Sequence, residues 1–259
     1  MRIITLLTDF GSFYPAQMKG VILSRLAEKA QEISFVDITH DIPPQDVCAG
    51  AFALLSSAHY FPPGTIHIAV VDPGVGTDRL GLVVESGGQL FVGPDNGLLL
   101  PAARSLGIPG NPPQAYKIAA SLEGLGLGPA SNTFHGRDIF APVAALLASG
   151  KSPASIGPRI RPKDLNFGVA KKTDRGIEAT VIYVDRFGNL ILNMRKVPAF
   201  QVRLKGIKLK RVRTYAQARR IEPLITHGSH GFAEIAVNQG NAAEAFCLKA
   251  GDRIELEEI

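Results

Sequence analysis

Residues 66–79 read IHIAVVDPGVGTDR, an unbroken apolar run that gives way to a polar loop containing two glycines. A short apolar run bounded by turn residues is typical of a strand that is buried on both faces, as in parallel sheets. In open α/β sheets, ligands bind beyond the carboxyl ends of such strands. Asp72, the first residue after the run, is therefore a candidate functional carboxylate.

The first 160 residues alternate between strand and helix patterns. We expect strands at 3–7, 33–36 and 66–71, a hairpin of 80–84 with 90–92, and helices at 17–30, 46–58 and 139–147. This alternation predicts a mostly parallel sheet covered by helices on both faces, an α/β sandwich. Asp9 and Asp37 also end apolar strands, so three strand-end carboxylates are expected; the alternative is that each is an ordinary turn residue.

The pattern changes after a stretch rich in Pro, Gly, Lys and Arg. Beyond it, short strands with glycine turns are expected at 177–184, 190–192, 202–204, 207–212, 232–237, 245–248 and 253–256. Such a run predicts a small all-β domain, either a barrel or a sandwich. We therefore expect an N-terminal α/β domain at 1–160, a linker at 161–174 and a C-terminal all-β domain at 175–259.

Composition excludes several classes of protein. No apolar run approaches the ~20 residues of a membrane span, and the N-terminal apolar stretch is too brief for a signal peptide. We therefore expect a cytoplasmic protein without membrane contact. Two cysteines, Cys48 and Cys247, are too few for a disulfide framework and too far apart for a zinc site. Both are expected to be buried free thiols.

The net charge of +5 is concentrated in residues 203–220, which carry eight Lys or Arg and no acid. One interpretation is a nucleic-acid patch. The other is a solvated strand pair, because Val202, Leu204, Ile207 and Leu209 alternate with the charges. We favour the strand pair and expect no nucleic-acid partner, since the stretch has a single aromatic residue, Tyr215, and lacks the interleaved aromatic series that suits base stacking.

Two clusters in the first domain carry candidate chemistry. A tight loop can bring Asp72 to Arg79, and a carboxylate beside Arg stays ionised and can orient a water; the alternative is a purely structural ion pair. His135, in NTFHGRD at 132–138, can serve as a base, a ligand or a hydrogen-bond partner. Gly124, Gly126 and Gly128 lack the spacing and the Lys of a nucleoside-triphosphate loop.

The second domain offers groups suited to a planar polar ligand. Asp185, Phe187 and Asn189 place a carboxylate, an aromatic face and a carboxamide within five residues. An aromatic ring can stack on a base, and Asn can pair with the amino edge of adenine. Polar glycine turns at 228–231 and 238–243 can bind a small ligand or can simply close hairpins.

Together these segments resemble one family. TDFG at 8–11, VDPGVG at 71–76, GPDNGL at 93–98, TFHGRD at 133–138, DRFGN at 185–189 and NQGNAA at 238–243 resemble the S-adenosylmethionine (SAM) hydroxide adenosyltransferases. These are SAM hydrolases related to the bacterial fluorinase and chlorinase, and the resemblance spans nearly the whole chain. It implies an α/β domain followed by a β-barrel, and a homotrimer with sites at the subunit interfaces. It also implies attack of water or hydroxide on the ribose C5′ of SAM, giving adenosine and methionine.

The resemblance also implies roles for individual residues. The water-handling set corresponds to Asp72, Arg79 and His135. The substrate-binding positions are Asp9 for the ribose hydroxyls, Phe187 and Asn189 for adenine, Asp185 and Ser229 for the methionine amine and carboxylate, and Ala243. His230 stands where the halogenase pattern has an Arg beside the substrate carboxylate.

The chemistry of SAM fits these residues. Its sulfonium is a cation whose thioether leaving group needs no proton, so we expect no general acid, no metal and no cofactor. The reaction needs an oriented, partly desolvated nucleophile in line with the C5′–S bond. The halogenases carry Tyr in place of Asp72 and Tyr-Ser in place of His135-Gly136, and an ionised Asp72 repels halide. We therefore expect hydrolysis; the alternatives are halide-dependent adenosyl transfer and a non-catalytic adenosine- or SAM-binding protein.

Overall fold

The computed structural model describes residues 1–118 and 128–259 and divides the chain into two units, Met1–Leu165 and Asn166–Ile259. Each unit has its own hydrophobic core. The stretch expected as a linker, 161–174, is thus shared between the two units. Gly124 and Gly126 lie outside the described residues.

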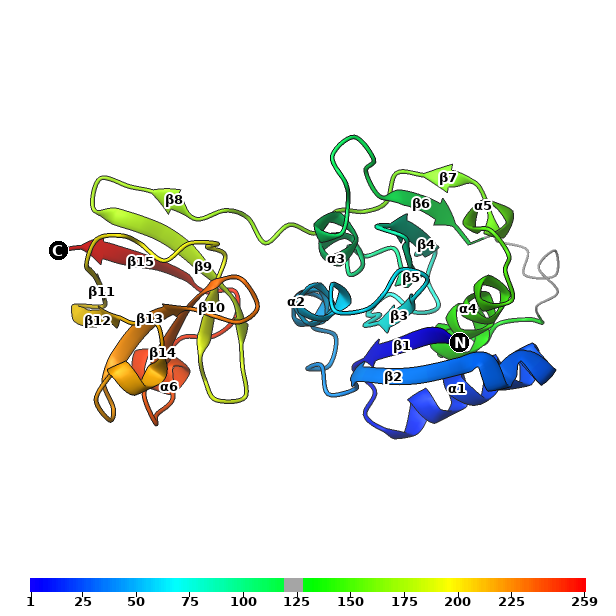
Figure 1. Ribbon diagram of the computed structural model, residues 1–259, viewed down its shortest axis with the longest axis horizontal. Coiled ribbons are helices and arrows are strands. Elements are labelled where there is room, and N and C mark those ends of the chain that lie inside the picture. Colours follow the sequence, from blue (N-terminus) through cyan, green and yellow to red (C-terminus); the bar gives the residue numbers. More distant parts are fainter. Residues whose placement is uncertain (119–127) are drawn as a thin grey trace. The chain divides into compact units, whose positions relative to one another are not determined.

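A seven-stranded sheet forms the centre of the first unit (Figure 1). β1 and β3 lie side by side and parallel, with Thr8 level with Val70, so the loops that begin with Asp9 and Asp72 leave the same edge of the sheet. The neighbours β2 and β5 extend this parallel part, whereas the pairings of β5 with β4, β4 with β6 and β6 with β7 are antiparallel. The predicted hairpin of β4 with β5 is confirmed. The strand order is β2 (Ile33–Thr39), β1 (Arg2–Thr8), β3 (Ile66–Val70), β5 (Gln89–Pro94), β4 (Gly81–Ser86), β6 (Gln114–Lys117) and β7 (Arg159–Ile160).

Helices cover both faces of this sheet, as the alternating pattern predicts. On one face α1 (Phe13–Leu26) and α4 (Ala141–Ala148) share a core with β1 and β3. On the other face lie α2 (Val47–Ala58) and α3 (Leu100–Ser105) (Figure 1). The Asp46 side chain caps α2 by accepting from Ala49 N–H at 2.8 Å, where the sequence places the helix start. α1 starts at residue 13 instead of 17, and its last predicted turn is a 3₁₀ helix, Ala27–Glu32.

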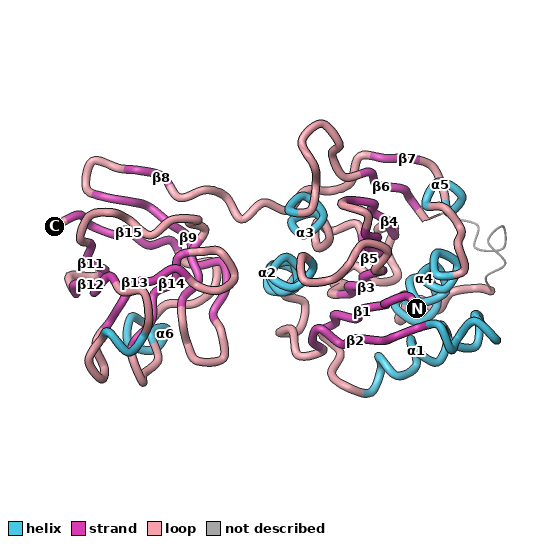
Figure 2. The backbone as a smooth tube through the Cα atoms, in the orientation of Figure 1, coloured by secondary structure: helices cyan, strands magenta, loops and turns pink. Residues whose placement is uncertain are grey.

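The second unit is a closed barrel of seven strands (Figure 2). Closure comes from the antiparallel pairing of β9 with both β10 and β15, and it leaves no unpaired edge in the ring. Around the ring the strands are β9 (Gly176–Val184), β10 (Leu190–Leu192), β14 (Ala233–Val237), β13 (Pro223–His227), β12 (Ile207–Arg211), β11 (Val202–Leu204) and β15 (Arg253–Glu258). The short β8 (Lys171–Lys172) pairs with β9 outside the ring.

Two expectations about local structure and burial are wrong. The strand expected at 245–248 is absent, because Ala242–Phe246 form α6, whose N-terminus is capped by Asn241 accepting from Glu244 N–H at 3.0 Å. Cys48 and Cys247 are free thiols, but both are exposed. Cys48 lies in the first turn of α2 on the side away from the core, and Cys247 follows the last residue of α6.

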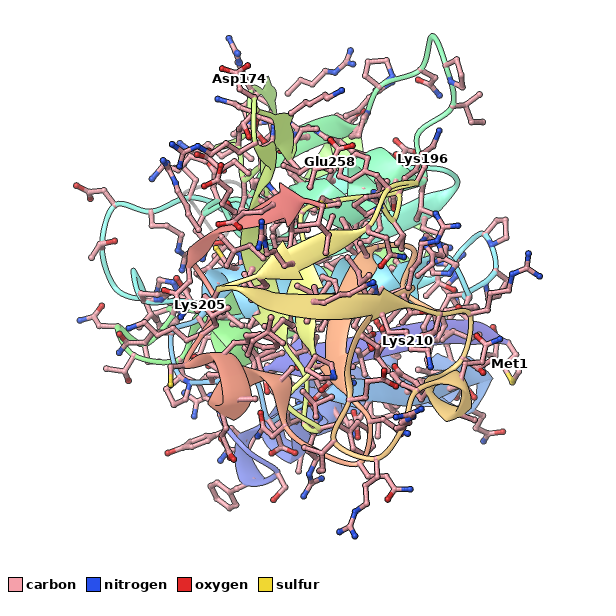
Figure 3. The ribbon with its side chains drawn as sticks, turned by 90° about the vertical axis from the view of Figure 1, so that its left-hand side faces the viewer. Met1, Asp174, Lys196, Lys205, Lys210 and Glu258 are labelled. Carbon is pink, nitrogen blue, oxygen red and sulfur yellow. The ribbon has the colours of Figure 1, made fainter. Side chains whose placement is uncertain are left out.

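The basic stretch forms the antiparallel hairpin of β11 and β12, which confirms the strand-pair interpretation. Val202, Leu204 and Leu209 are buried, while Lys205 and Lys210 lie near its two ends (Figure 3). Part of the charge is paired, since Arg203 lies 2.8 Å from Glu257. Within residues 1–118 and 128–259, no helix is both long and apolar enough to span a bilayer.

Candidate active site

Asp72, Arg79 and His135 form one hydrogen-bonded group. Arg79 donates through Nε to Asp72 Oδ1 at 3.0 Å and through Nη2 to Oδ2, so the pair is bidentate. The same Nη2 lies 2.9 Å from His135 Nδ1. The side chains of Arg79 and Asp72 are only 6% and 5% exposed. The structure thus joins the two clusters that the sequence singles out separately.

The hydrogen bonds and the burial set the protonation of this group. Burial raises the pKa of Asp72, and the Arg79 guanidinium offsets part of that rise. Burial, together with the charge of Arg79, lowers the pKa of His135. Because Arg79 has no acceptor, His135 Nδ1 must accept from it, so the neutral ring carries its proton on Nε2. The group therefore offers a buried carboxylate acceptor next to an imidazole Nε2–H donor.

Two further motifs hold the Asp72 loop in place. Asn96, from the GPDNGL segment, donates through Nδ2 to the Val71 carbonyl at 2.8 Å, and its Oδ1 accepts from Leu98 N–H at 3.2 Å. Gly76 has φ +78°, and a Cβ there would lie 2.3 Å from the carbonyl oxygen of Asn132. The loops at 72–79 and 132–138 can therefore pack together only with glycine at position 76.

His135 is carried on the entrance to a π-helical turn, Gly136–Phe140, that leads into α4. The Asp138 carboxylate stabilises this turn by accepting from Ser131 N–H at 2.9 Å. Arg137 and the hydrogen bonds from Ser131 lower the pKa of Asp138 to about 2. Phe140, at the end of the turn, lies under the Arg79 guanidinium at 5.4 Å from its ring centroid. One turn of helix thus positions both His135 and the Phe140 ring on which the Arg79 guanidinium lies.

A pocket of about 490 Å³ opens over this group and contains Asp9, Asp72 and His135 in its lining. Asp9 Oδ2 accepts from Gln45 N–H at 2.8 Å, which leaves the rest of the carboxylate available to a ligand. The rings of Phe10, Tyr14 and Phe134 pack edge to face along the same pocket. Asp37 is not among the lining residues, and it lies within β2 instead of at the end of a strand. Its side chain pairs with Lys19 at 2.6 Å and lies 3.2 Å from His40. The expectation of a third strand-end carboxylate is therefore wrong, and Asp37 is not a turn residue either.

The DRFGN segment of the second unit is folded around its own carboxylate. Asp185 Oδ1 accepts from the backbone N–H groups of Phe187 and Asn189, and Oδ2 accepts from Asn189 Nδ2, each at 2.9 Å. The Phe187 side chain is left 76% exposed. Gly188 has φ +80° and packs against Asn241, and its carbonyl accepts from Ala243 N–H at 2.9 Å. The structure therefore brings the DRFGN and NQGNAA segments together.

A pocket of about 1020 Å³ in the second unit is lined by Asp185, Phe187, Asn189 and Ser229. Its wall also contains Tyr215 and Glu234, which sequence reasoning misses. Tyr215 Oη donates to Glu234 Oε1 at 2.5 Å across 19 residues of chain. The sequence does contain a signal for Glu234, since it is the single acid within the apolar run 232–237. A carboxylate that is buried in such a run needs a specific partner.

Comparisons with known proteins identify the family. The model of the SAM hydroxide adenosyltransferase N-terminal domain matches residues 4–157, and that of the C-terminal domain matches residues 179–255. The chain belongs to the SAM hydroxide adenosyltransferase family. A protein of Thermus thermophilus named (R)-S-adenosyl-L-methionine hydrolase is similar to it, at 38% identity over 99% of this chain and 100% of the relative. A protein of the same name from Salinispora tropica is 39% identical over 98% of this chain and 97% of the relative.

More distant relatives and solved structures extend this placement. A protein of Nocardia brasiliensis named fluorinase is 24% identical over 98% of this chain and 96% of its own. The crystal structure of an uncharacterized conserved protein from Thermotoga maritima superposes with a TM-score of 0.83. It is 33% identical, and the match covers 98% of this chain and 99% of that one.

In this member of the SAM hydroxide adenosyltransferase family, the residues expected at the site fall into two groups. Asp9, Asp72 and His135 line the pocket of the first unit, and Arg79 joins Asp72 to His135 by hydrogen bonds. Asp185, Phe187, Asn189 and Ser229 line the pocket of the second unit, while Ala243 meets that group through its backbone. Among the described residues, no cluster of three or more His, Cys, Asp or Glu side chains is arranged to hold a metal ion.

Proposed function

We propose that this protein hydrolyses S-adenosyl-L-methionine to adenosine and L-methionine. The observation that carries the proposal is the hydrogen-bonded Asp72–Arg79–His135 group, of which Asp72 and His135 line one pocket together with Asp9. The names of relatives at 38–39% identity, (R)-S-adenosyl-L-methionine hydrolase, support the same activity.

The proposed reaction is a displacement at the ribose C5′. The oxygen of a water forms the new bond to C5′ while the C5′–S bond breaks. The electron pair of the C5′–S bond goes to sulfur, which leaves as the neutral thioether of methionine. The water proton passes to Asp72, whose pKa is raised by burial. Arg79 holds the carboxylate in one orientation, and His135 Nε2–H fixes the water by donating to its oxygen.

The substrate contacts proposed for the remaining residues follow their chemistry. Asp9 accepts the ribose hydroxyls, and the exposed Phe187 ring stacks on adenine, whose edge bonds to Asn189. Asp185, Ser229 and Ala243 complete the substrate contacts. The proposal includes no cofactor, no metal, no nucleic-acid partner and a cytoplasmic location. It also includes a homotrimer in which each site is shared between subunits.

The test is product analysis at neutral pH. The protein, dialysed against EDTA, is incubated with SAM, and adenosine and methionine are separated by chromatography. We expect both products in equal amounts, and a loss of about 100-fold or more in kcat for Asp72→Asn, which removes the base but keeps its shape. Asp164→Asn, an exposed aspartate paired with Arg104, is the matched control and should retain full activity.

Three outcomes contradict the proposal. Formation of 5′-halo-adenosine when fluoride or chloride is added indicates adenosyl transfer to halide. Binding of SAM without turnover indicates a binding protein. Equal activity of wild type and Asp72→Asn shows that Asp72 does not act as the base in the reaction.

A further inference from the structure

The loop after β2 is hydrogen-bonded to the end of β1, the strand that leads into Asp9. Thr8, the last residue of β1, is fully buried, and its Oγ1 lies 2.9 Å from His40 Nδ1. This bond forms whichever ring nitrogen carries the proton, because a hydroxyl can donate or accept. The His40 carbonyl accepts from Gly11 N–H at 3.0 Å, and the Thr8 carbonyl accepts from Ile42 N–H at 3.4 Å. His40 is therefore bonded to the chain on both sides of Asp9.

The same loop also reaches the Asp9 carboxylate, because Gln45 N–H donates to its Oδ2 at 2.8 Å. Gln45 adopts φ +66°, in the left-handed region that residues other than glycine rarely occupy. Strain of this kind persists only where the surrounding structure holds it, and it concentrates at functional sites. The loop at 40–45 thus holds both the backbone around Asp9 and one oxygen of its side chain.

His40 is itself enclosed on its other edge. Its side chain is 13% exposed, and its Nε2 lies 3.2 Å from Asp37 Oδ1 on β2. Asp37 Oδ2 in turn pairs with Lys19 Nζ on α1 at 2.6 Å. Burial acts to raise the pKa of Asp37, but the hydrogen bonds and charges of Lys19 and His40 outweigh it and lower that pKa. The imidazole therefore lies between the Thr8 hydroxyl and an ionised carboxylate.

We propose that His40 is a positioning residue for the ribose end of the substrate. It fixes the backbone before and after Asp9 and begins the loop whose Gln45 N–H orients that carboxylate. This inference rests on the proposed function, in which Asp9 accepts the ribose hydroxyls. His40 is not among the residues that line the pocket, so its effect on the substrate passes through Asp9.

A purely structural role for His40 makes a different prediction. If His40 only joins β1 to the loop after β2, its loss lowers the melting temperature and leaves recognition of the ribose unchanged. If it positions Asp9, its loss weakens the ribose contact itself. The quantity that separates the two roles is the preference for SAM over the analogue in which hydrogen replaces the ribose 2′-hydroxyl.

The experiment measures this preference in binding and in hydrolysis. Calorimetry gives Kd, and release of the nucleoside gives kcat and KM, for SAM and for the 2′-deoxy analogue. We expect the wild type to prefer SAM by about 10- to 100-fold, as for a hydrogen bond to a charged group, and Asp9→Asn to lose most of this preference. His40→Ala should reduce the preference about 3- to 10-fold through a higher KM for SAM, with a smaller change in kcat.

Two substitutions at Thr8 keep the test independent of the folding of His40→Ala. Thr8→Val keeps the branched shape but removes the hydroxyl, so it should reduce the preference as His40→Ala does. Thr8→Ser keeps the hydroxyl and should keep the preference of the wild type. His59→Ala is the matched control, because His59 is exposed, packs on Tyr60 and lies outside the pocket lining.

The outcomes separate the positioning role from the proposed function. An unchanged preference in His40→Ala and Thr8→Val overturns the positioning role even if hydrolysis proceeds, and a lower melting temperature then marks a structural role. Equal binding of SAM and the 2′-deoxy analogue by the wild type also overturns it. A binding preference that falls in both variants, without hydrolysis by any of the proteins, keeps the positioning role and rejects the proposed function. If SAM neither binds nor reacts, both are wrong.

Discussion

At the scale of the residue, Arg79 connects more groups than any other side chain of the candidate site. It is bidentate to Asp72, bonds His135, donates through Nη1 to the Leu80 carbonyl at 2.9 Å and lies over Phe140. A lysine has the same charge but lacks the planar fork that makes these bonds together. Arg79 therefore fixes the directions of both the acceptor and the donor proposed to hold the water.

We expect Arg79→Lys to lower kcat for SAM hydrolysis by about 10- to 100-fold, because a displaced Asp72 or His135 misplaces the attacking water. KM should change little, since Arg79 touches other protein groups. Steady-state kinetics check this, with Arg104→Lys as the control because that pair is exposed. A rise in KM at constant kcat is the opposite pattern and indicates a role in substrate binding.

The buried His67 makes stability depend on pH. Its Nδ1 lies 2.7 Å from Thr5 Oγ1 and its Nε2 lies 2.8 Å from Gln89 Oε1, within the sheet of the first unit. Burial lowers its pKa to about 4, below the ordinary value of 6.5. The unfolded chain therefore binds a proton at a higher pH than the folded chain. The stability contribution is complete above pH 6.5 and is lost as pH falls toward 4, by up to about 3 kcal/mol.

Urea unfolding of the wild type at several pH values between 4.5 and 7.5 measures this loss. His67→Gln cannot titrate in this range, so its free energy of unfolding should fall less over the same interval, whatever its stability at neutral pH. Parallel curves for the two proteins contradict the assignment to His67.

At the scale of the element, the loop after β5 holds the loop after β3 in place by a hydrogen bond. Asn96 joins them by donating to the carbonyl of Val71, the residue before Asp72. Asn96→Asp keeps the oxygen that accepts from Leu98 N–H but loses the donor, whereas Asn96→Ala loses both. We expect both variants to lower kcat by about 10-fold with a smaller effect on KM. The reason is that the loop after Val71 would shift, and this loop carries Asp72, which is proposed to accept the proton of the attacking water. A melting temperature that falls with unchanged kcat limits Asn96 to a stabilising role.

The elements that the sequence predicts well are those with a clear period. β1, β3 and the β4–β5 hairpin follow apolar runs, and α2 follows its Asp46 cap. Local context misleads at residues 245–248, where an apolar run belongs to a capped helix. β13 was missed because its run opens with Pro223 and is short. Burial was misjudged for Cys48, because residue type does not say which side of a helix faces the core.

At the scale of the whole molecule, the sequence predicts the units and much of the candidate site, but not every contact. Asp72, Arg79 and His135 were recognisable because each lies in a motif with a chemical rationale. Their hydrogen bonds join loops 56 residues apart, and only the fold shows the geometry. Glu234 was missed because its partner Tyr215 comes from a different segment with no motif of its own.

The proposed assembly makes a prediction that single variants cannot test. The Asp72 group lies in the first unit, and Phe187 lies in the pocket of the second, so the contacts proposed for the substrate come from both units. If each site takes one unit from each of two subunits, Asp72→Ala and Phe187→Ala chains complement one another. A site is intact when its first unit comes from a Phe187→Ala chain and its second from an Asp72→Ala chain.

Co-expression of the two variants with different tags, followed by purification on both tags, gives the mixed oligomers. A mixed trimer of either composition has one intact site in three, so about a third of the wild-type activity per chain should return. Light scattering should give three times the 27.6 kDa chain mass. Each variant purified alone is the control, since neither can form an intact site. Activity no higher than the mean of the two controls means that each site is built within one chain, because then every site carries one of the two substitutions.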